Sequence, residues 1–190
     1  FDIRKDTLYC SSYDSVERRS CRTVLDILFN CICTWLAPIL CFTTEEAWKT
    51  HNIDEDESVH LKEYFKPNSL WNEDGLSEKW EVIRNLRLKV TNKIEEKRRE
   101  GLIGSSLEAK INLEVSSNYY KTFSNLNLSE IFICSAVECE VSNNVENDDV
   151  KVNCEKVSGL KCERCWKISD DVKMDSSLCP RCRNVIDTLK

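Results

Sequence analysis

Apolar residues recur at helical spacing in two long stretches of the chain. Between Ser15 and Leu36 they return every three or four residues and leave a polar stripe on the opposite side, which predicts a core helix. The spacing resumes near residue 76 and stops at Gly101, a residue type that often ends helices, which predicts a second long helix. The apolar face of this second helix holds Trp80, Ile83, Leu86, Val90 and Ile94.

The segment between the two helices has a different character. Thr43 and Glu46 have the spacing of a capping box, which predicts the start of a short helix. Residues 45–78 then hold ten acidic and three basic side chains, a composition that favours a solvated connection over a packed element or a metal site. His51 and His60 lie in this segment, and we expect both at the surface.

After Gly104 the pattern changes from helical spacing to alternation. Residues 110–115 alternate apolar and polar side chains, which predicts a strand with Ile111, Leu113 and Val115 on one face. We expect a small α/β unit here, with an antiparallel component. Its further elements are a short helix over 117–126, strands at 131–134, 137–141 and 150–154, and a polar turn at 142–149.

A membrane span is the rival interpretation of the first helix, because residues 24–42 contain no Lys or Arg over 19 positions. The polar stripe continues into this run and Pro38 interrupts it, so a helix in a soluble bundle is the better interpretation.

Composition narrows the class of protein. The 190 residues are 41% hydrophobic and 32% charged, which allows one large or two to three small domains and excludes a disordered chain. The net charge of −6 gives no argument for nucleic acid from the chain as a whole, so such an argument must be local. The start at Phe1, inside an apparently structured sequence, suggests a piece excised from a longer protein.

Twelve cysteines are the most unusual part of the composition. The first residues carry no secretory signal pattern, so we expect a cytoplasmic location and reduced thiols. Four of the twelve form two Cys-x-x-Cys pairs separated by thirteen residues: Cys162, Cys165, Cys179 and Cys182. We interpret the other eight as small apolar side chains.

The two Cys-x-x-Cys pairs predict one zinc ion. Each pair aims two thiolates at one point, and four thiolates complete the tetrahedral shell that Zn²⁺ accepts. A redox dithiol would need only one pair, and iron–sulfur clusters usually show other spacings. Because four cysteines leave no open position for water or substrate, the zinc is expected to be structural, and we predict no catalytic residue.

Two groups of basic residues are candidates for RNA binding. Residues 151–190 hold nine basic and six acidic side chains, and the zinc motif presents the first group: Arg164, Trp166, Arg181 and Arg183. The alternative is that the Trp forms the core of the module and the arginines its solvated rim. The second group, on one side of the second long helix, is Arg84, Arg87 and Arg98. It offers either a phosphate-binding surface or a solvated flank.

Several segments together resemble one family. They are YC at 9–10, RR at 18–19, WLAPIL at 35–40, FTTEEAW at 42–48, IGSSLEA at 103–109, and the zinc motif with its KCERCW and LCPRC. Over nearly the whole chain they resemble the C-terminal region of isoleucyl-tRNA synthetase, a class I aminoacyl-tRNA synthetase.

The resemblance implies a mainly α fold in three parts. These are a helical anticodon-binding bundle over 1–104, a small α/β unit over 105–156 and a zinc ribbon or knuckle over 157–190. It implies recognition of the tRNA-Ile anticodon stem-loop, with the catalytic and editing domains of the same longer chain as further partners and no membrane.

The resemblance also implies a parent enzyme that ligates isoleucine to its tRNA with ATP. The HIGH and KMSKS signatures of class I synthetases do not occur in this chain, so we expect this piece neither to bind ATP nor to charge tRNA. The alternative function is a zinc-stabilised protein-interaction module, which the acidic stretches favour. A zinc hydrolase is discarded, because it would need an open coordination position.

Overall fold

The computed structural model describes residues 1–52, 57–142 and 150–188, and it divides into two compact units. The first unit combines residues 1–12 with 74–190, and the second spans residues 13–73. Most of the polar turn predicted at 142–149, and most of the acidic run at 54–57, lies outside the described residues.

Two helices, α2 (Val16–Leu36) and α3 (Cys41–His51), form the body of the second unit. Ser15 caps α2, and its hydroxyl accepts a hydrogen bond from the N–H of Arg18 at 3.2 Å, so the predicted first helix is present. The prediction of a core helix is wrong for much of its apolar face, because Val24, Leu28, Ile32 and Trp35 are exposed. The hydrophobic core cluster of this unit consists of Cys33, Ala37, Trp48 and Val59.

The predicted capping box at Thr43 is wrong. Helix α3 begins at Cys41, so Thr43 lies inside its first turn, and the residue at the cap position, Leu40, contributes no side-chain hydrogen bond. The carboxylate next to the expected partner is used differently: Glu45 accepts hydrogen bonds from the Ser58 hydroxyl at 2.8 Å and the Val59 N–H at 3.0 Å. It therefore ties α3 to the following segment.

The connection predicted over 45–78 is partly structured. Besides the end of α3 it contains two short 3-10 helices, Val59–Leu61 and Ser69–Trp71. Val59 is 1% exposed and anchors the first of them in the core of the unit. His51 and His60 are exposed, as predicted.

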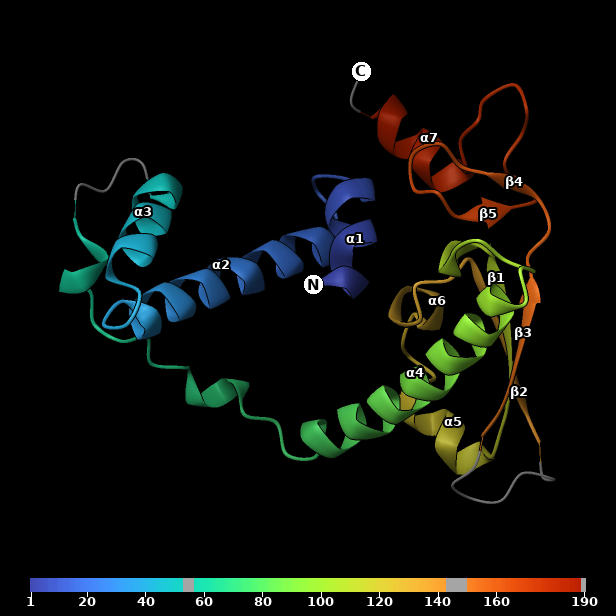
Figure 1. The fold of residues 1–190 in the computed structure, drawn as a ribbon, viewed down its shortest axis with the longest axis horizontal. Coiled ribbons are helices and arrows are strands. Elements are labelled where there is room, and N and C mark those ends of the chain that lie inside the picture. Colours follow the sequence, from blue (N-terminus) through green and yellow to red (C-terminus); the bar gives the residue numbers. More distant parts are fainter. Residues whose placement is uncertain (53–56, 143–149, 189–190) are drawn as a thin grey trace. The chain divides into compact units, whose positions relative to one another are not determined.

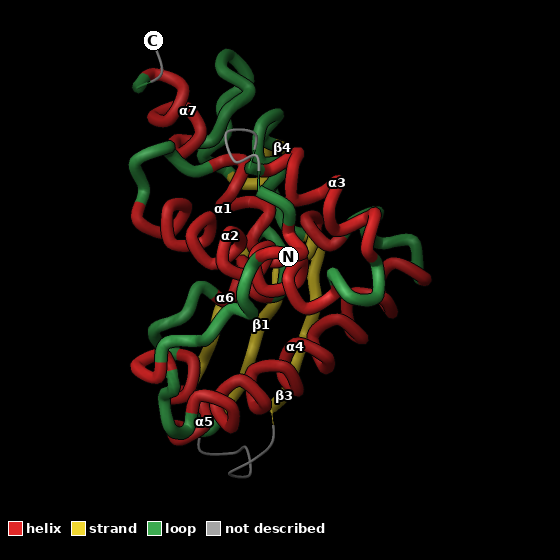
Figure 2. Tube along the Cα trace, turned by 90° about the vertical axis from the view of Figure 1, so that its left-hand side faces the viewer, coloured by secondary structure: helices red, strands yellow, loops and turns green. Residues whose placement is uncertain are grey.

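The second predicted helix is α4 (Leu76–Arg99), in the first unit. Gly101 follows it with a φ of 73°, and its N–H donates to the Arg98 carbonyl at 3.0 Å, which closes the helix as the sequence predicts. Four of the five residues predicted on its apolar face are buried and Trp80 is half-buried. The helix lies along the small sheet (Figures 1 and 2).

The sheet has three strands in the order β2-β1-β3. The strands are β1 (Ala109–Val115), β2 (Ala136–Val141) and β3 (Val150–Lys156). Strand β1 pairs parallel with β2 and antiparallel with β3, so the predicted antiparallel component is present. The alternate residues of β1 that face α4 are fully buried, which confirms the predicted strand face.

The strand predicted at 131–134 is wrong. Helix α6 (Leu128–Ile131) occupies the start of this segment and a turn at Ile133, with a φ of 55°, occupies the rest. Phe132 and Cys134 are buried in the sheet core, so the apolar run reflects burial and not a strand. The strand expected next begins at Ala136, and the short helix predicted over 117–126 is α5 (Ser117–Phe123).

Short elements complete the first unit. They are the 3-10 helices Asp2–Arg4 and Ser106–Glu108, α1 (Lys5–Cys10), β4 (Leu160–Lys161), β5 (Ile168–Ser169) and α7 (Pro180–Asp187). Strands β4 and β5 form an antiparallel pair.

The division predicted at residue 104 does not separate two cores. Helix α4 and the sheet share one hydrophobic core, because a three-stranded sheet needs a covering layer to bury one face. Where the boundaries of the three predicted domains lie therefore stays a prediction. In the described parts of the chain, no helix is both long and apolar enough to cross a membrane.

Candidate metal centre and RNA-binding surface

The four cysteines of the predicted zinc motif come from two local elements. Cys162 follows β4, and its N–H donates to the Lys167 carbonyl at 2.9 Å, which turns the chain so that Cys165 also faces inward. Cys179 is the N-cap residue of α7, and Cys182 lies in the first turn of that helix. The β4–β5 hairpin thus supplies one pair of cysteines, and the N-terminus of α7 supplies the other.

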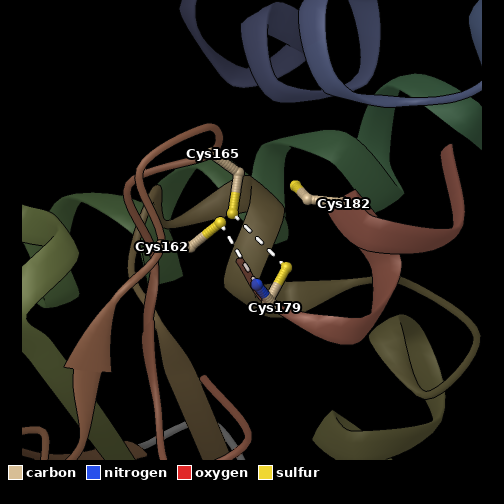
Figure 3. Close-up of side chains that lie close together, drawn as sticks. All are labelled: Cys162, Cys165, Cys179 and Cys182. Carbon is tan, nitrogen blue, oxygen red and sulfur yellow. Dashed lines mark hydrogen bonds between the residues drawn. The ribbon is translucent and has the colours of Figure 1, made fainter. Parts of the chain in front are cut away.

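The four sulfur atoms converge, as Figure 3 shows. One ligand atom from each cysteine lies within 4.8 Å of all the others, and the Cys165 and Cys179 sulfurs are 3.8 Å apart. A tetrahedral zinc shell with Zn–S bonds of about 2.3 Å places its sulfurs about 3.8 Å apart. The donor set and its spacing therefore fit one Zn²⁺ ion with all four positions filled by protein.

Hydrogen-bond donors surround this sulfur cluster. Burial opposes ionisation of Cys162, but the N–H groups of Cys165, Cys179 and Arg164 outweigh it and lower the pKa of this thiol to about 6. Burial raises the pKa of Cys165 to about 12. Since zinc binds thiolates, loading the site must release protons, and its affinity must fall at low pH.

Little besides the cysteines forms the interior of the module. Its buried cluster consists of Cys162, Cys182 and Val172, with Leu178 and the other two cysteines packed against it. An interior of this size cannot offset the conformational entropy of ordering the segment, so the ion would be the main source of its stability.

The predicted arginines of the module are held by the protein itself. The Arg164 guanidinium donates to the carbonyls of Cys10 at 2.5 Å and Tyr9 at 3.2 Å, at the end of α1. Arg181 makes a two-pronged ion pair with Asp6, with both N···O distances at 2.7 Å. Both contacts attach the module to α1.

Arg183 is half-buried and donates to the hydroxyl of Ser176 within the module. The pairing of Arg181 raises the pKa of that guanidinium. Burial opposes ionisation of Asp6, but the hydrogen bond from Arg181 outweighs it and lowers the pKa of this carboxyl. Each of the three arginines therefore has a partner within the protein, although Arg181 is also exposed to solvent.

Trp166 is placed differently from the arginines. Its side chain is 59% exposed, so it is not the core of the module, and the ammonium of Lys161 lies 5.5 Å from its ring centroid. Its backbone has a φ of 64°, a conformation that costs free energy for any residue except glycine. A large, exposed aromatic ring next to a cation is suitable for stacking on an unpaired base.

The three arginines predicted on α4 divide into two kinds. Arg84 and Arg98 are exposed, and Arg98 pairs with Glu95 on the same helix at 2.8 Å. Arg87 is half-buried and donates from Nε to the Ile131 carbonyl at 2.9 Å. Arg87 and Arg98 nevertheless line one cavity of about 330 Å³, together with Ser105 and Ser106.

Sequence reasoning assigned no role to α1, although its carbonyls and Asp6 hold the zinc module. No local signal could have found this contact, because 175 positions separate Asp6 from Arg181. The only hint was the YC pair at residues 9 and 10, which carried part of the family resemblance.

Comparison with known proteins identifies the family of the N-terminal part of the chain. Residues 1–113 match the family model described as the anticodon-binding domain of tRNA ligase. The chain belongs to this family. Residues 159–185 match a second family model, described as a zinc finger found in FPG and IleRS, which includes all four converging cysteines. The match and the cluster together indicate a structural zinc site.

Several relatives of this chain are isoleucine–tRNA ligases. The one from Gluconobacter oxydans is 43% identical over 98% of this chain, and the one from Zymomonas mobilis is 42% identical over 98%. The relative from Caldicellulosiruptor saccharolyticus is 38% identical over 97%. The chain spans about a fifth of the length of each of these relatives.

Proposed function

We propose that this chain is the part of an isoleucine–tRNA ligase that recognises the anticodon stem-loop of tRNA-Ile. The observation that carries this proposal is the match of residues 1–113 to the anticodon-binding family, joined on one chain to the zinc-finger match. The longer protein would ligate isoleucine to tRNA with ATP, and its catalytic and editing domains would be further partners of this chain. The chain alone would bind RNA and catalyse nothing.

We assign two kinds of RNA contact. Exposed Arg84 and Arg98 on α4 contact phosphates of the anticodon stem. These contacts position the RNA without reading its sequence. Trp166 stacks on a base of the loop, because its exposed ring offers the flat face that an unpaired base needs. Base contacts discriminate between anticodons, and phosphate contacts do not.

The remaining predicted residues act through the protein. Arg164 and Arg181 hold the zinc module against α1, and Arg183 braces the loop that contains Ser176. Arg87 is held by the Ile131 carbonyl and leaves part of its guanidinium to the cavity that it shares with Arg98. We assign one structural zinc ion to the four cysteines.

An anisotropy titration tests the proposal. The zinc-loaded chain is titrated with the isoleucine anticodon stem-loop and with a control whose anticodon is exchanged, at two salt concentrations. We expect tighter binding to the cognate loop and a steep loss of affinity with salt, because phosphate contacts release counterions. Weak, salt-insensitive binding, or no binding, would instead support the alternative of a protein-interaction module.

Variants separate the two kinds of contact. Trp166→Ala is expected to weaken cognate binding and to reduce the preference for the isoleucine anticodon. Arg84→Ala is expected to weaken binding to both stem-loops equally. Trp71→Ala removes a similarly exposed Trp (54%) from the second unit and serves as the matched control. Equal, sequence-blind losses from Trp166→Ala and Arg84→Ala would contradict this division.

A further inference from the structure

The two Cys-x-x-Cys turns of the zinc module have an arginine at the same position. The first turn reads Cys-Glu-Arg-Cys and the second reads Cys-Pro-Arg-Cys, so Arg164 and Arg181 each come immediately before the second cysteine of their pair. Both side chains bind the same element outside the module, α1. Each arginine therefore joins α1 to a position directly next to one of the converging cysteines.

The guanidinium of Arg164 also contacts one of the sulfurs. Its Nη1 donates to Cys182 Sγ at 3.7 Å, and the same nitrogen donates to the Cys10 carbonyl at 2.5 Å. The Cys10 thiol in turn donates to the Arg164 carbonyl at 3.6 Å. One half-buried guanidinium thus connects the end of α1 directly to a ligand of the proposed ion.

The chemistry of both ends explains why an arginine is suited to this position. Tyr9 and Cys10 lie in the last turn of α1, where carbonyls have no partner within the helix. A guanidinium presents several N–H groups in a fixed fork, so it can satisfy two carbonyls and a sulfur together. Four thiolates around one divalent ion leave an excess of negative charge, which an N–H donor at a sulfur stabilises. The contacts that hold α1 therefore also favour the metal-bound form of the cysteines.

No shared apolar core supplements these polar contacts. A cavity of about 690 Å³ occupies part of the space between α1 and the module. The residues that line it from the two sides include Tyr9, Cys10, Cys165 and Trp166. Within the described residues, the buried apolar cluster of the module contains no side chain from α1. The contacts of the two arginines are therefore the main link between α1 and the module.

We propose that Arg164 and Arg181 are positioning residues of the zinc site, and that they couple metal binding to the docking of α1. Docked α1 holds the Arg164 guanidinium against the Cys182 sulfur, and this contact slows the loss of the ion. Because coupled equilibria are reciprocal, the bound ion holds α1 in place to the same extent. The inference rests on the zinc ion proposed for the four cysteines and does not depend on RNA binding.

The rate of zinc release from the loaded chain tests this coupling. The chain is mixed with an excess of a colorimetric chelator, and absorbance reports the release. Arg164→Met keeps an unbranched stem but has no N–H donor, so we expect release about 10-fold to 100-fold faster, as is typical when a group that supports a metal ligand is lost. Lys173→Met removes an exposed cation from the same module and should release zinc at the rate of the parent.

A variant in α1 separates the coupling from a change within the module. Asp6→Asn breaks the ion pair with Arg181 and leaves every residue of the module intact. We expect zinc release about 2-fold to 5-fold faster, because this pair is partly exposed. Asp2→Asn is the matched control: it breaks an ion pair with Lys5, at 2.7 Å, that does not reach the module, and should not change the rate.

Cobalt absorption gives a readout that a merely structural role of Arg164 would not change. Co²⁺ can replace Zn²⁺ at a site of four thiolates, and its sulfur-to-metal charge-transfer bands depend on the hydrogen bonds that the sulfurs accept. Arg164→Met should shift these bands, and Lys173→Met should not. Circular dichroism of each loaded variant establishes that it is folded.

The outcomes separate this inference from the proposals beside it. Faster release for both Arg164→Met and Asp6→Asn, with both controls unchanged, supports the coupling. If only Arg164→Met releases zinc faster, or if neither variant does, α1 has no part in the site and the coupling is overturned, while the proposed ion stands. If the parent chain binds no zinc, the proposed ion fails and the coupling fails with it. The titration with stem-loops measures RNA binding independently of all these results.

Discussion

The mixed sheet with α4 and the four-cysteine module belong to the same compact unit but are stabilised by different interactions. The sheet buries a continuous set of large apolar side chains, among them Leu86 and Ile111, which are fully inaccessible. The module buries Val172 and cysteine sulfur and little else. Hydrophobic burial can therefore fold the sheet, whereas the module depends on the ion that its sulfurs bind. A substitution that creates a cavity can therefore destabilise the sheet, and a chelator that removes the ion can destabilise the module.

Removal of the metal should give the largest effect and the sharpest contrast. Structural zinc contributes an apparent free energy of about 10–16 kcal/mol in zinc-finger peptides, so a chelator should unfold residues 157–188. The same loss is expected for Cys182→Ser. The sheet should stay folded, because its core contains none of the four ligands. Amide hydrogen exchange resolved by peptide measures both regions in one experiment.

Cys41→Ser is the matched control for that experiment, since Cys41 is an exposed cysteine of the second unit. It should change neither zinc content nor exchange in the module. Equal loss of protection in the sheet and the module after chelation would show that the two regions do not differ as we propose.

A cavity in the sheet core should give the next largest effect, with the opposite pattern. Leu86 is 0% exposed, so Leu86→Ala should lower the free energy of unfolding of the sheet by about 2–5 kcal/mol. Urea unfolding measures this loss, and a zinc-competition titration should find the metal affinity unchanged. Leu88→Ala, on the same helix at 61% exposure, should have a small effect. A large drop in zinc affinity for Leu86→Ala would argue against separate stabilisation.

The attachment between the module and α1 should give a smaller effect. Arg181→Gln removes the two-pronged ion pair with Asp6, a partly exposed interaction worth about 1 kcal/mol. We expect faster hydrogen exchange in α1 with zinc still bound. Lys173→Gln removes an exposed charge from the same module and should leave α1 unchanged. If both variants speed exchange in α1 equally, the change in net charge, and not the loss of the Arg181–Asp6 ion pair, is responsible.

A change outside both regions should give the smallest effect and is expected to depend on pH. Hydrogen bonds from the Ser58 hydroxyl and the Lys49 ammonium lower the pKa of Glu45 below its usual value of 4.5. Its stabilising contribution is therefore complete above pH 4.5 and is lost as the pH falls through the lower folded pKa. Hydrogen exchange of Glu45→Gln should exceed that of the parent within residues 13–73 at pH 7, and the two should converge in acid. A difference that persists in acid would exclude ionisation as the cause.

Local sequence patterns predicted the elements that have one strong signal. Helix α4 repeats its apolar residues over many turns and β1 alternates across its whole length, so their faces could be assigned before the structure. The extent of α2 could be predicted in the same way but its buried face could not, because Val24, Leu28, Ile32 and Trp35 are exposed. The run at 131–134 had no such period. Its side chains are apolar because they are buried, and a short apolar run does not distinguish a strand from a helix and a turn.

Capping and ion pairing were harder to predict, since both depend on neighbours that the pattern does not contain. Thr43 matched a capping box, but the helix begins two residues earlier and Glu45 bonds to a later segment instead. The arginines of the module were predicted as RNA contacts, and the fold engages Arg164 and Arg181 with α1. The sequence position of a charged side chain does not reveal which group it will pair with in the folded protein.

The sequence alone identified the four cysteines that converge, because Cys-x-x-Cys spacing brings two sulfurs together through local backbone geometry and two such pairs suffice for one ion. It also determined the two long helices and the central strand, whose periodic patterns span many residues. Only the tertiary structure decided what the zinc module packs against and which aromatic rings share a cavity. Tyr9 and Trp166 are separated by most of the chain, and contacts between such distant residues depend on the whole fold, which no local pattern records.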